Sequence, residues 1–401
     1  MADITIHGVH VVWSGTQSKL NWGKVNCNWV LTYFRLPRTF QIDSSGQLFL
    51  LIKSKQGVQE FVSSVGISSL LRYKGHCPRR WSNNSIPKKS STSTMSSEKI
   101  STRFLIISDT HDPSLEESTG PFQFPTPKPD VLLHCGDLTQ LGCISELKRA
   151  VHMVSSIDAE LKLVIAGNHD LSLDAEYSKS HPDVVDQKEH QAAMDIMTGT
   201  LAKENGVTYL EEGVHTFTLK SGANFRIYVS PYQPDFCDWA FPYKPEEDRY
   251  NLQHQVATNQ RYEIKSIATN PVPDFGDEGV DIMMTHGPPH RILDHCRSGN
   301  IGCPSLLQAV SRARPQLHCF GHIHEGHGEK IMTWKEDKSL MGEQAIEAHG
   351  HHQMNSYPEP RKWPLVPGKE TLMVNAAIMD GRYEPNNEHW LVDLDLPRTE
   401  S

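Results

Sequence analysis

Five short polar motifs contain the residue types that bind divalent metal ions. They are Asp109-Thr110-His111, Gly136-Asp137, Gly167-Asn168-His169-Asp170, Thr285-His286-Gly287 and Gly321-His322-Ile323-His324. Their carboxylate, imidazole and amide groups form a mixed set of hard and borderline ligands, which suits Mn, Fe or Zn better than soft ions. The two oxygens of a carboxylate such as Asp137 can bridge a pair of metal ions ~3.5–4 Å apart, and such pairs activate water for attack on phosphate esters. The motifs therefore indicate hydrolytic chemistry at a dinuclear centre.

Each motif also has an ordinary structural explanation. Asp109-x-His111 could be a helix cap or a turn, and Gly136-Asp137 is a common turn pair. His322-x-His324 is more specific, because alternate residues of an extended chain share one face and both imidazoles can reach one site. Five such motifs in this order make coincidence a poor explanation.

The elements before the motifs favour a common location for them. Each motif directly follows a short apolar run that predicts a buried strand, at residues 103–108, 131–134, 161–166, 281–285 and 316–320. Ligand sites in α/β sheets gather at the carboxyl ends of the strands. We therefore expect the five strand ends to converge on one crevice.

The remaining pattern predicts an α/β fold with some antiparallel pairing. Helices are expected within residues 143–157, 186–203 and 304–314, a β-hairpin at residues 214–220 and 224–229, and closing strands at residues 371–375 and 390–394. The polar stretch 333–369, with His349, His351 and His352, is expected to be a mobile surface loop, with adventitious metal binding as the alternative.

Taken in order, these motifs resemble those of the calcineurin-like metallophosphoesterase superfamily, over residues 102–397. A subgroup similar to the metallophosphoesterase-domain-containing proteins and their fungal relatives is indicated by three segments, Ser230–Pro234, Thr285–Pro289 and Phe320–Gly326. Asn375-Ala376 also fits, although Ala377 stands where a Ser is expected. The resemblance implies an α/β (α+β) sandwich of two packed mixed β-sheets flanked by helices, with the metal site at the carboxyl ends of strands.

The resemblance also implies a role for each site residue. Asp109, His111 and His324 would bind the first metal ion, Asn168, His286 and His322 the second, and Asp137 would bridge the two. His169 would contact the scissile phosphate and assist the leaving group, with Asn168 also binding substrate. Asp170 would orient His169 by fixing the tautomer of its imidazole.

The implied reaction is hydrolysis of a small phosphodiester or phosphomonoester, with cyclic nucleotides among the candidates and two Mn, Fe or Zn ions as cofactors. The protein Ser/Thr phosphatases of this superfamily carry G-D-x-x-D-R-G, whereas this chain has Gln140 and Leu141 in place of that Asp and Arg. The rival interpretation is a catalytically silent scaffold that binds protein partners. It is disfavoured because all seven ligand positions and His169 are filled.

The substrate pocket is expected beside the metal ions, lined by the loop 232–242 and by the segment after Asp170. Trp239, Phe241 and Tyr243 could stack on a nucleobase there, or pack against the body of the protein.

The first hundred residues differ from the rest. They hold 13 Lys and Arg against 4 Asp and Glu, whereas the remaining chain has a balance of −18. We expect residues 1–100 to be a basic, poorly ordered extension, and residues 101–397 to form the metallophosphoesterase domain. The Ser/Thr-rich stretch ending near Met95 indicates a linker, so Met95 is a candidate functional start. A basic arm built on Arg79, Arg80, Lys88 and Lys89 is the alternative for this extension.

The net charge and the cysteine pattern argue against several other classes of function. The negative charge of the chain beyond residue 100 repels nucleic acid and attracts divalent cations, so nucleic-acid binding driven by long-range electrostatics is disfavoured. None of the eight cysteines forms a Cys-x-x-Cys pair, which argues against a zinc finger or redox dithiol. Because no signal peptide and no run of about 18 apolar residues is found, a cytoplasmic location without membrane association is expected.

Overall fold

A computed structural model describes residues 99–112, 128–256, 263–350 and 355–399 in full. In the first hundred residues it also describes the backbone of five strands. The chain divides into two compact units, Met1–Ser91 and Thr92–Ser401. His351 and His352 lie outside the described residues.

The first unit contains two small antiparallel sheets. Strands β1 (Ala2–Ile6) and β2 (Val9–Trp13) form a hairpin, and β3 (Arg38–Ile42), β4 (Leu48–Ser54) and β5 (Gly57–Phe61) form a three-stranded sheet. Most of the expected poorly ordered extension lies outside the described residues, so that expectation stays a prediction.

The second unit is built on two mixed sheets. The six-stranded sheet has the order β22 (Arg361–Lys362), β24 (Trp390–Pro397), β6 (Lys99–Ile107), β7 (Val131–His134), β8 (Leu161–Val164) and β9 (Val207–Tyr209). The seven-stranded sheet has the order β10 (Gly213–Thr218), β11 (Asn224–Ser230), β16 (Ile282–Thr285), β19 (Leu317–Phe320), β23 (Glu370–Asn375), β20 (Gly328–Trp334) and β21 (Ile346–His349). Strands β6 to β9 are mutually parallel, as are β11, β16, β19 and β23.

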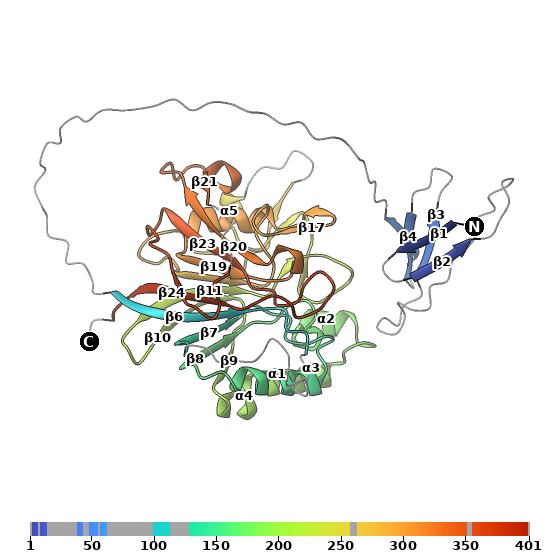
Figure 1. Ribbon diagram of the computed structural model, residues 1–401, viewed down its shortest axis with the longest axis horizontal. Coiled ribbons are helices and arrows are strands. Elements are labelled where there is room, and N and C mark those ends of the chain that lie inside the picture. Colours follow the sequence, from blue (N-terminus) through green and yellow to red (C-terminus); the bar gives the residue numbers. More distant parts are fainter. Residues whose placement is uncertain are drawn as a thin grey trace, which may run out of the picture. The chain divides into compact units, whose positions relative to one another are not determined.

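The sheets pack face to face between two helical layers (Figure 1). On β6, Phe104 and Ile106 enter the core between the sheets, whereas Leu105 and Ile107 face α1 (Ile144–Ser155) and α3 (Gln187–Thr198). This alternation follows from the two-residue side-chain period of a strand. On the outer face of the other sheet, Met283 and its neighbours pack against α5 (Pro304–Ala313). The predicted sandwich is confirmed.

Helix ends explain where the predicted helices begin and break. The side chain of Glu146 accepts hydrogen bonds from the amides of Leu141 and Cys143, and so fixes the start of α1. The helix expected within residues 186–203 is divided, because Gly199 adopts an extended conformation between α3 and α4 (Thr200–Glu204). The short helix α2 (Ala175–Ser180) was not expected.

The prediction of a loop over residues 333–369 is wrong in part. Residues up to Trp334 belong to β20, and Ile346–His349 form the edge strand β21, paired antiparallel to β20. A polar edge strand lacks the apolar alternation by which strands are recognised. His349 therefore lies at the end of a strand.

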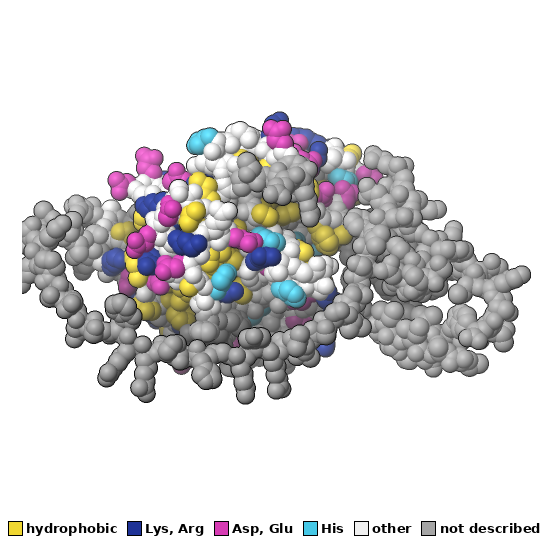
Figure 2. All heavy atoms as spheres, turned by 90° about the horizontal axis from the view of Figure 1, so that it is seen from above, with side chains coloured by type: hydrophobic (Ala, Val, Ile, Leu, Met, Phe, Trp, Pro, Cys, Tyr) yellow, Lys and Arg dark blue, Asp and Glu magenta, His cyan; other side chains and the backbone are white. Residues whose placement is uncertain are grey.

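The described surface carries mixed charge. On the coloured part of the face in Figure 2, acidic side chains lie among lysines and arginines, and several histidines are visible. Among the described residues, none of the helices has both the length and the apolar composition needed to cross a membrane.

Candidate metal centre

The turns that follow β6, β7 and β19 hold their polar residues in an uncommon backbone conformation. Asp109, His111, Asp137 and His322 have φ angles of 55°, 46°, 52° and 67°. Such left-handed angles are rare outside glycine and persist only where surrounding contacts determine them. Hydrogen bonds between turns supply these contacts, from the amide of Asp109 to the carbonyl of Gly136 (3.0 Å) and from the amide of His111 to the carbonyl of Asp137 (3.1 Å).

Two motif glycines are required by close approach. A Cβ on Gly321 would collide with the Asp109 carboxylate and the Ser108 side chain, and a Cβ on Gly167 would collide with Asp137. The space that these glycines leave lets the strand-end turns meet.

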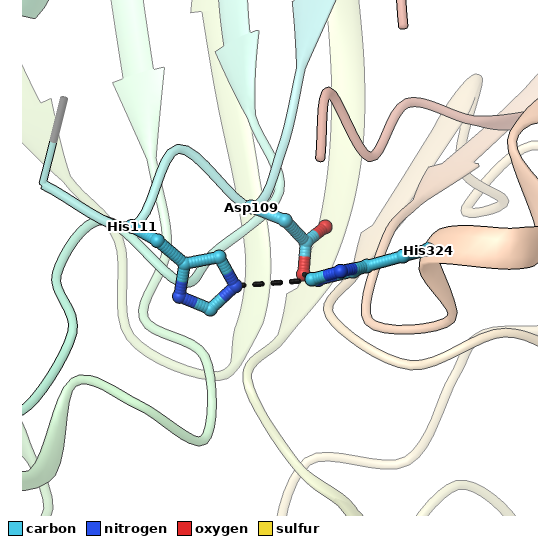
Figure 3. Close-up of side chains that lie close together, drawn as sticks. All are labelled: Asp109, His111 and His324. Atoms are coloured by element: carbon cyan, nitrogen blue, oxygen red, sulfur yellow. Dashed lines mark hydrogen bonds and ion pairs between the residues drawn. The ribbon is translucent and has the colours of Figure 1, made fainter. Parts of the chain in front are cut away.

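The first group of side chains comes from opposite sheets. Asp109 and His111 follow β6, and His324 follows β19; the three converge as Figure 3 shows. The Nε2 atoms of His111 and His324 lie 3.2 Å apart, and the Nε2 atom of His324 lies 3.5 Å from Oδ1 of Asp109. Lone-pair atoms of three buried side chains thus point at one small volume.

A second group lies beside the first and shares Asp137 with it. Oδ1 of Asp137 lies 3.4 Å from Nε2 of His286, whereas its Oδ2 lies 3.7 Å from Nε2 of His111. His322 belongs to this second group, and Nε2 of His286 is also 2.8 Å from Oδ1 of Asn168. One carboxylate therefore faces both groups, one oxygen to each.

The charge balance of the site calls for cations. Asp109 and Asp137 are 0% and 2% exposed, and among the described residues their ion pairs are formed with histidines and none with Lys or Arg. Buried carboxylates require compensating positive charge. Burial opposes ionisation of Asp109, but hydrogen bonding and the charge of His324 outweigh it and lower the pKa of Asp109 to about 2. The residues present therefore fit a pair of divalent metal ions.

The histidines of the site differ in the direction in which their pKa is shifted. Burial lowers the pKa of His111 and of His322 to about 3, which leaves both rings neutral and able to donate a lone pair. Burial disfavours the charged form of His286 as well, but the Asp137 carboxylate raises the pKa of His286 to about 9. The Asp137 carboxylate thus stabilises a proton on His286 that a bound cation would replace.

His169 contacts residues of the two groups of candidate ligands. Its amide donates a 2.8 Å hydrogen bond to Oδ1 of Asp137, and its ring packs edge-on against His111 at a centroid distance of 4.6 Å. Its Nδ1 lies 2.9 Å from the carbonyl oxygen of Gln140. Because a carbonyl only accepts, this contact places a proton on Nδ1.

The contact expected between Asp170 and the His169 ring is not the one that the structure shows. The Asp170 carboxylate does not bind the His169 ring but accepts hydrogen bonds from the amides of Leu138, Thr139 and Gly167, at 3.2, 3.0 and 2.8 Å, and from the Thr139 hydroxyl at 2.7 Å. The tight turn directs this side chain back beneath the motif, between two backbone segments. The carbonyl oxygen of Gln140 contacts Nδ1 of His169 instead.

The aromatic residues of the loop predicted to line the pocket differ in their burial. Phe241 and Tyr243 are buried and pack in the hydrophobic cores, so they do not offer faces to a ligand. Trp239 stacks on His169, with ring centroids 4.1 Å apart. The base-stacking alternative therefore survives for Trp239 alone.

Tyr383 was missed by sequence reasoning. Its ring lies 4.7 Å from His324 and 5.4 Å from His111. It stands in a turn without periodicity or motif, so no signal in the sequence marks it.

Asn375, which fits the subgroup pattern in the sequence, stabilises the backbone of a ligand motif. Its amide donates to the carbonyl of Ile323, within the Gly321–His324 motif.

Comparison with known proteins agrees with this geometry. Residues 102–326 match the calcineurin-like phosphoesterase family. The chain is similar to metallophosphoesterase domain-containing protein 1 of Homo sapiens and of Mus musculus, with 32% identity over 310 residues that cover 74% of this chain and 72% of each relative. A protein named probable rhamnogalacturonate lyase C, from Emericella nidulans, is 30% identical over 290 residues, which are 70% of this chain and 23% of that protein.

The matched region contains all five motifs, both groups of converging side chains and the shared carboxylate. The chain belongs to the calcineurin-like phosphoesterase family.

Proposed function

We propose that this protein is a dinuclear metal-dependent phosphoesterase that hydrolyses a small phosphodiester or phosphomonoester. The observation that carries the proposal is the orientation of Asp137, whose two oxygens face histidines of different groups. Asp109, His111 and His324 would hold one ion, Asn168, His286 and His322 the other, and Asp137 both. When bound, two such ions polarise the phosphoryl group and lower the pKa of water to near 7, which supplies hydroxide.

The protein's own groups complete the chemistry. Buried ligand side chains exclude bulk water, which strengthens every electrostatic interaction with the phosphoryl oxygens. The carbonyl of Gln140 holds the proton on Nδ1 of His169, so Nε2 would contact the phosphoryl group and, once it has taken up a second proton from solvent, donate that proton to the leaving oxygen. Water displaces the ester oxygen directly, so no covalent phosphoenzyme forms.

Cyclic nucleotides are among the substrates we propose, and Mn, Fe or Zn the metals, since the mixed oxygen and imidazole ligands suit these ions. Cysteine usage supports a reducing, cytoplasmic setting. Among the described residues, Cys135, Cys143, Cys296, Cys303 and Cys319 form no disulfide.

The Asp137→Asn substitution tests the proposal. Purified wild-type protein should contain two transition-metal ions per chain and hydrolyse bis(p-nitrophenyl) phosphate, p-nitrophenyl phosphate or a cyclic nucleotide. Asp137→Asn removes one bridging oxygen, so kcat should fall by roughly 100-fold or more, beyond the ~10–100-fold typical of outer-shell partners.

Asp395→Asn is the matched control, because the Asp395 side chain is 41% exposed on β24 and pairs with Lys362. It should retain wild-type metal content and kcat. Metal-loaded wild-type protein without hydrolysis of any of these esters would favour the silent scaffold instead.

A further inference from the structure

Five rings form a continuous series along the rim of the candidate metal centre. Trp239 stacks on His169 at 4.1 Å, and His169 meets His111 at 4.6 Å. Tyr383 meets both His324, at 4.7 Å, and His111, at 5.4 Å. His111 and His169 are 3% and 7% exposed, whereas Trp239 is half-buried and Tyr383 is 56% exposed. Trp239 and Tyr383 are therefore more accessible than His111 and His169.

Hydrogen bonds of the residues around Trp239 anchor its backbone. The amide of the next residue, Ala240, donates to the carbonyl of Asn168, and the amide of Phe241 donates a 2.6 Å hydrogen bond to Asp174. The side chain of Gln233 donates to the Ala240 carbonyl across the same loop (2.7 Å). These bonds tie the Trp239 backbone to the motif that carries His169.

Tyr383 is fixed by a separate turn. Its amide donates to the carbonyl of Asp380 (2.9 Å), and the Asp380 carboxylate accepts from the amides of Arg382 and Glu384 at 2.7 and 3.2 Å. Nδ1 of His324 lies 3.2 Å from the same Asp380 carbonyl. Tyr383 has a φ of 61°, a costly angle for a bulky residue, so the turn holds its ring in a position that the unconstrained chain avoids.

We propose that Trp239 and Tyr383 select substrates whose non-reacting group is a flat ring, such as a nucleoside, over substrates with a small aliphatic group. This inference rests on the proposed hydrolysis. Two rigid aromatic surfaces lose little conformational freedom on binding, and stacking on an aromatic side chain is tolerant of the identity of the base. Loss of one such surface should lower selectivity roughly 5- to 100-fold.

The test compares two esters that share one leaving group, thymidine 5′-(p-nitrophenyl phosphate) and methyl p-nitrophenyl phosphate. In each, the oxygen of water forms a bond to phosphorus, the bond from phosphorus to the aryl oxygen breaks, and p-nitrophenolate departs. The measured quantity is the ratio of kcat/KM for the nucleoside ester to that for the methyl ester. Any general damage to His169 or to the metal centre cancels in this ratio.

Wild-type protein should favour the nucleoside ester at least several-fold. Trp239→Leu and Tyr383→Leu should each lower the ratio, whereas Tyr383→Phe, which keeps the ring, should preserve it. Phe236→Leu is the control, because Phe236 is an exposed ring in the same loop as Trp239 outside the series. Metal content and circular dichroism of each variant confirm that it is folded and loaded.

The two possible failures are distinguishable. Absence of hydrolysis of both esters by the metal-loaded wild type would overturn the proposed function and the inference together. Hydrolysis of both with a ratio near one, or a ratio unchanged by Trp239→Leu and Tyr383→Leu, would overturn the selectivity inference and leave the hydrolase in place. A drop with Phe236→Leu equal to that with Trp239→Leu would also overturn the assignment of Trp239.

Discussion

At the scale of single residues, position next to a ligand does not define a role. Asp170 directly follows His169, yet its buried carboxylate binds three backbone amides and one hydroxyl of two neighbouring turns. Burial and the charge of Asp137 raise the pKa of Asp170 to about 7. The side chain therefore joins the turn after β7 to the turn after β8, which carry Asp137 and Asn168.

This arrangement predicts that Asp170→Asn acts on stability. The amide nitrogen of Asn would face N–H donors, so the free energy of unfolding should fall by ~1–3 kcal/mol, the cost of unsatisfied buried donors. Urea denaturation measures this loss, with Asp395→Asn as the partly exposed control. Unchanged stability together with an altered pH profile of kcat would instead support an orienting role toward His169.

At the scale of elements, strands with a motif at their end were predictable, and loops and polar edges were not. Apolar runs such as residues 161–166 identify buried strands, because both faces of the six-stranded sheet are covered. The edge strand β21 is polar, and the break between α3 and α4 depends on the backbone of a single glycine. Neither leaves a periodic signal.

In the site, too, the residues at strand ends were predictable and the loop residues were not. Residue types and motif order predicted the convergence of the seven candidate ligands with His169. The contact of Trp239 with His169 and the placement of Tyr383 depend on tertiary loop packing, which local sequence does not encode. The expected contact of Asp170 with the His169 ring was wrong because a tight turn, and not sequence adjacency, decides where a side chain points.

The core of β19 carries a pH-dependent element. His318 is fully buried, with Nε2 2.9 Å from the Thr285 hydroxyl, and burial lowers its pKa to about 3. Between pH 6.5 and 3 His318 is protonated in the unfolded chain but remains neutral in the folded protein. The free energy of unfolding therefore falls as the pH drops through this range. The slope is at most about 1.4 kcal/mol per pH unit.

Removing the titrating ring should flatten that dependence. We expect His318→Gln to show a shallower fall in the free energy of unfolding between pH 6.5 and 4 than wild type, as measured by urea titrations. His152→Gln, at an exposed position of α1, should keep the wild-type slope. Equal slopes for wild type and His318→Gln would contradict the assignment of His318 as a buried neutral histidine.

At the scale of the whole second unit, the candidate centre is assembled by the packing of two sheets. Turns of the six-stranded sheet supply Asp109, Asp137 and Asn168, and turns of the seven-stranded sheet supply His286 and His324. The apolar core between the sheets fixes their spacing, so the fold itself sets the distances among ligand atoms. The buried carboxylates lack Lys or Arg partners in the described part of the chain, which is the electrostatic reason for the fold to bind cations.

The most direct test is electron paramagnetic resonance of protein loaded with Mn²⁺. If Asp137 bridges two ions, wild-type protein should bind two Mn²⁺ per chain and give the spectrum of an exchange-coupled pair. Asp137→Asn should lose that coupling, and Asp395→Asn should retain it. A wild-type spectrum of isolated Mn²⁺ ions, or a stoichiometry of one or none, would contradict the dinuclear centre.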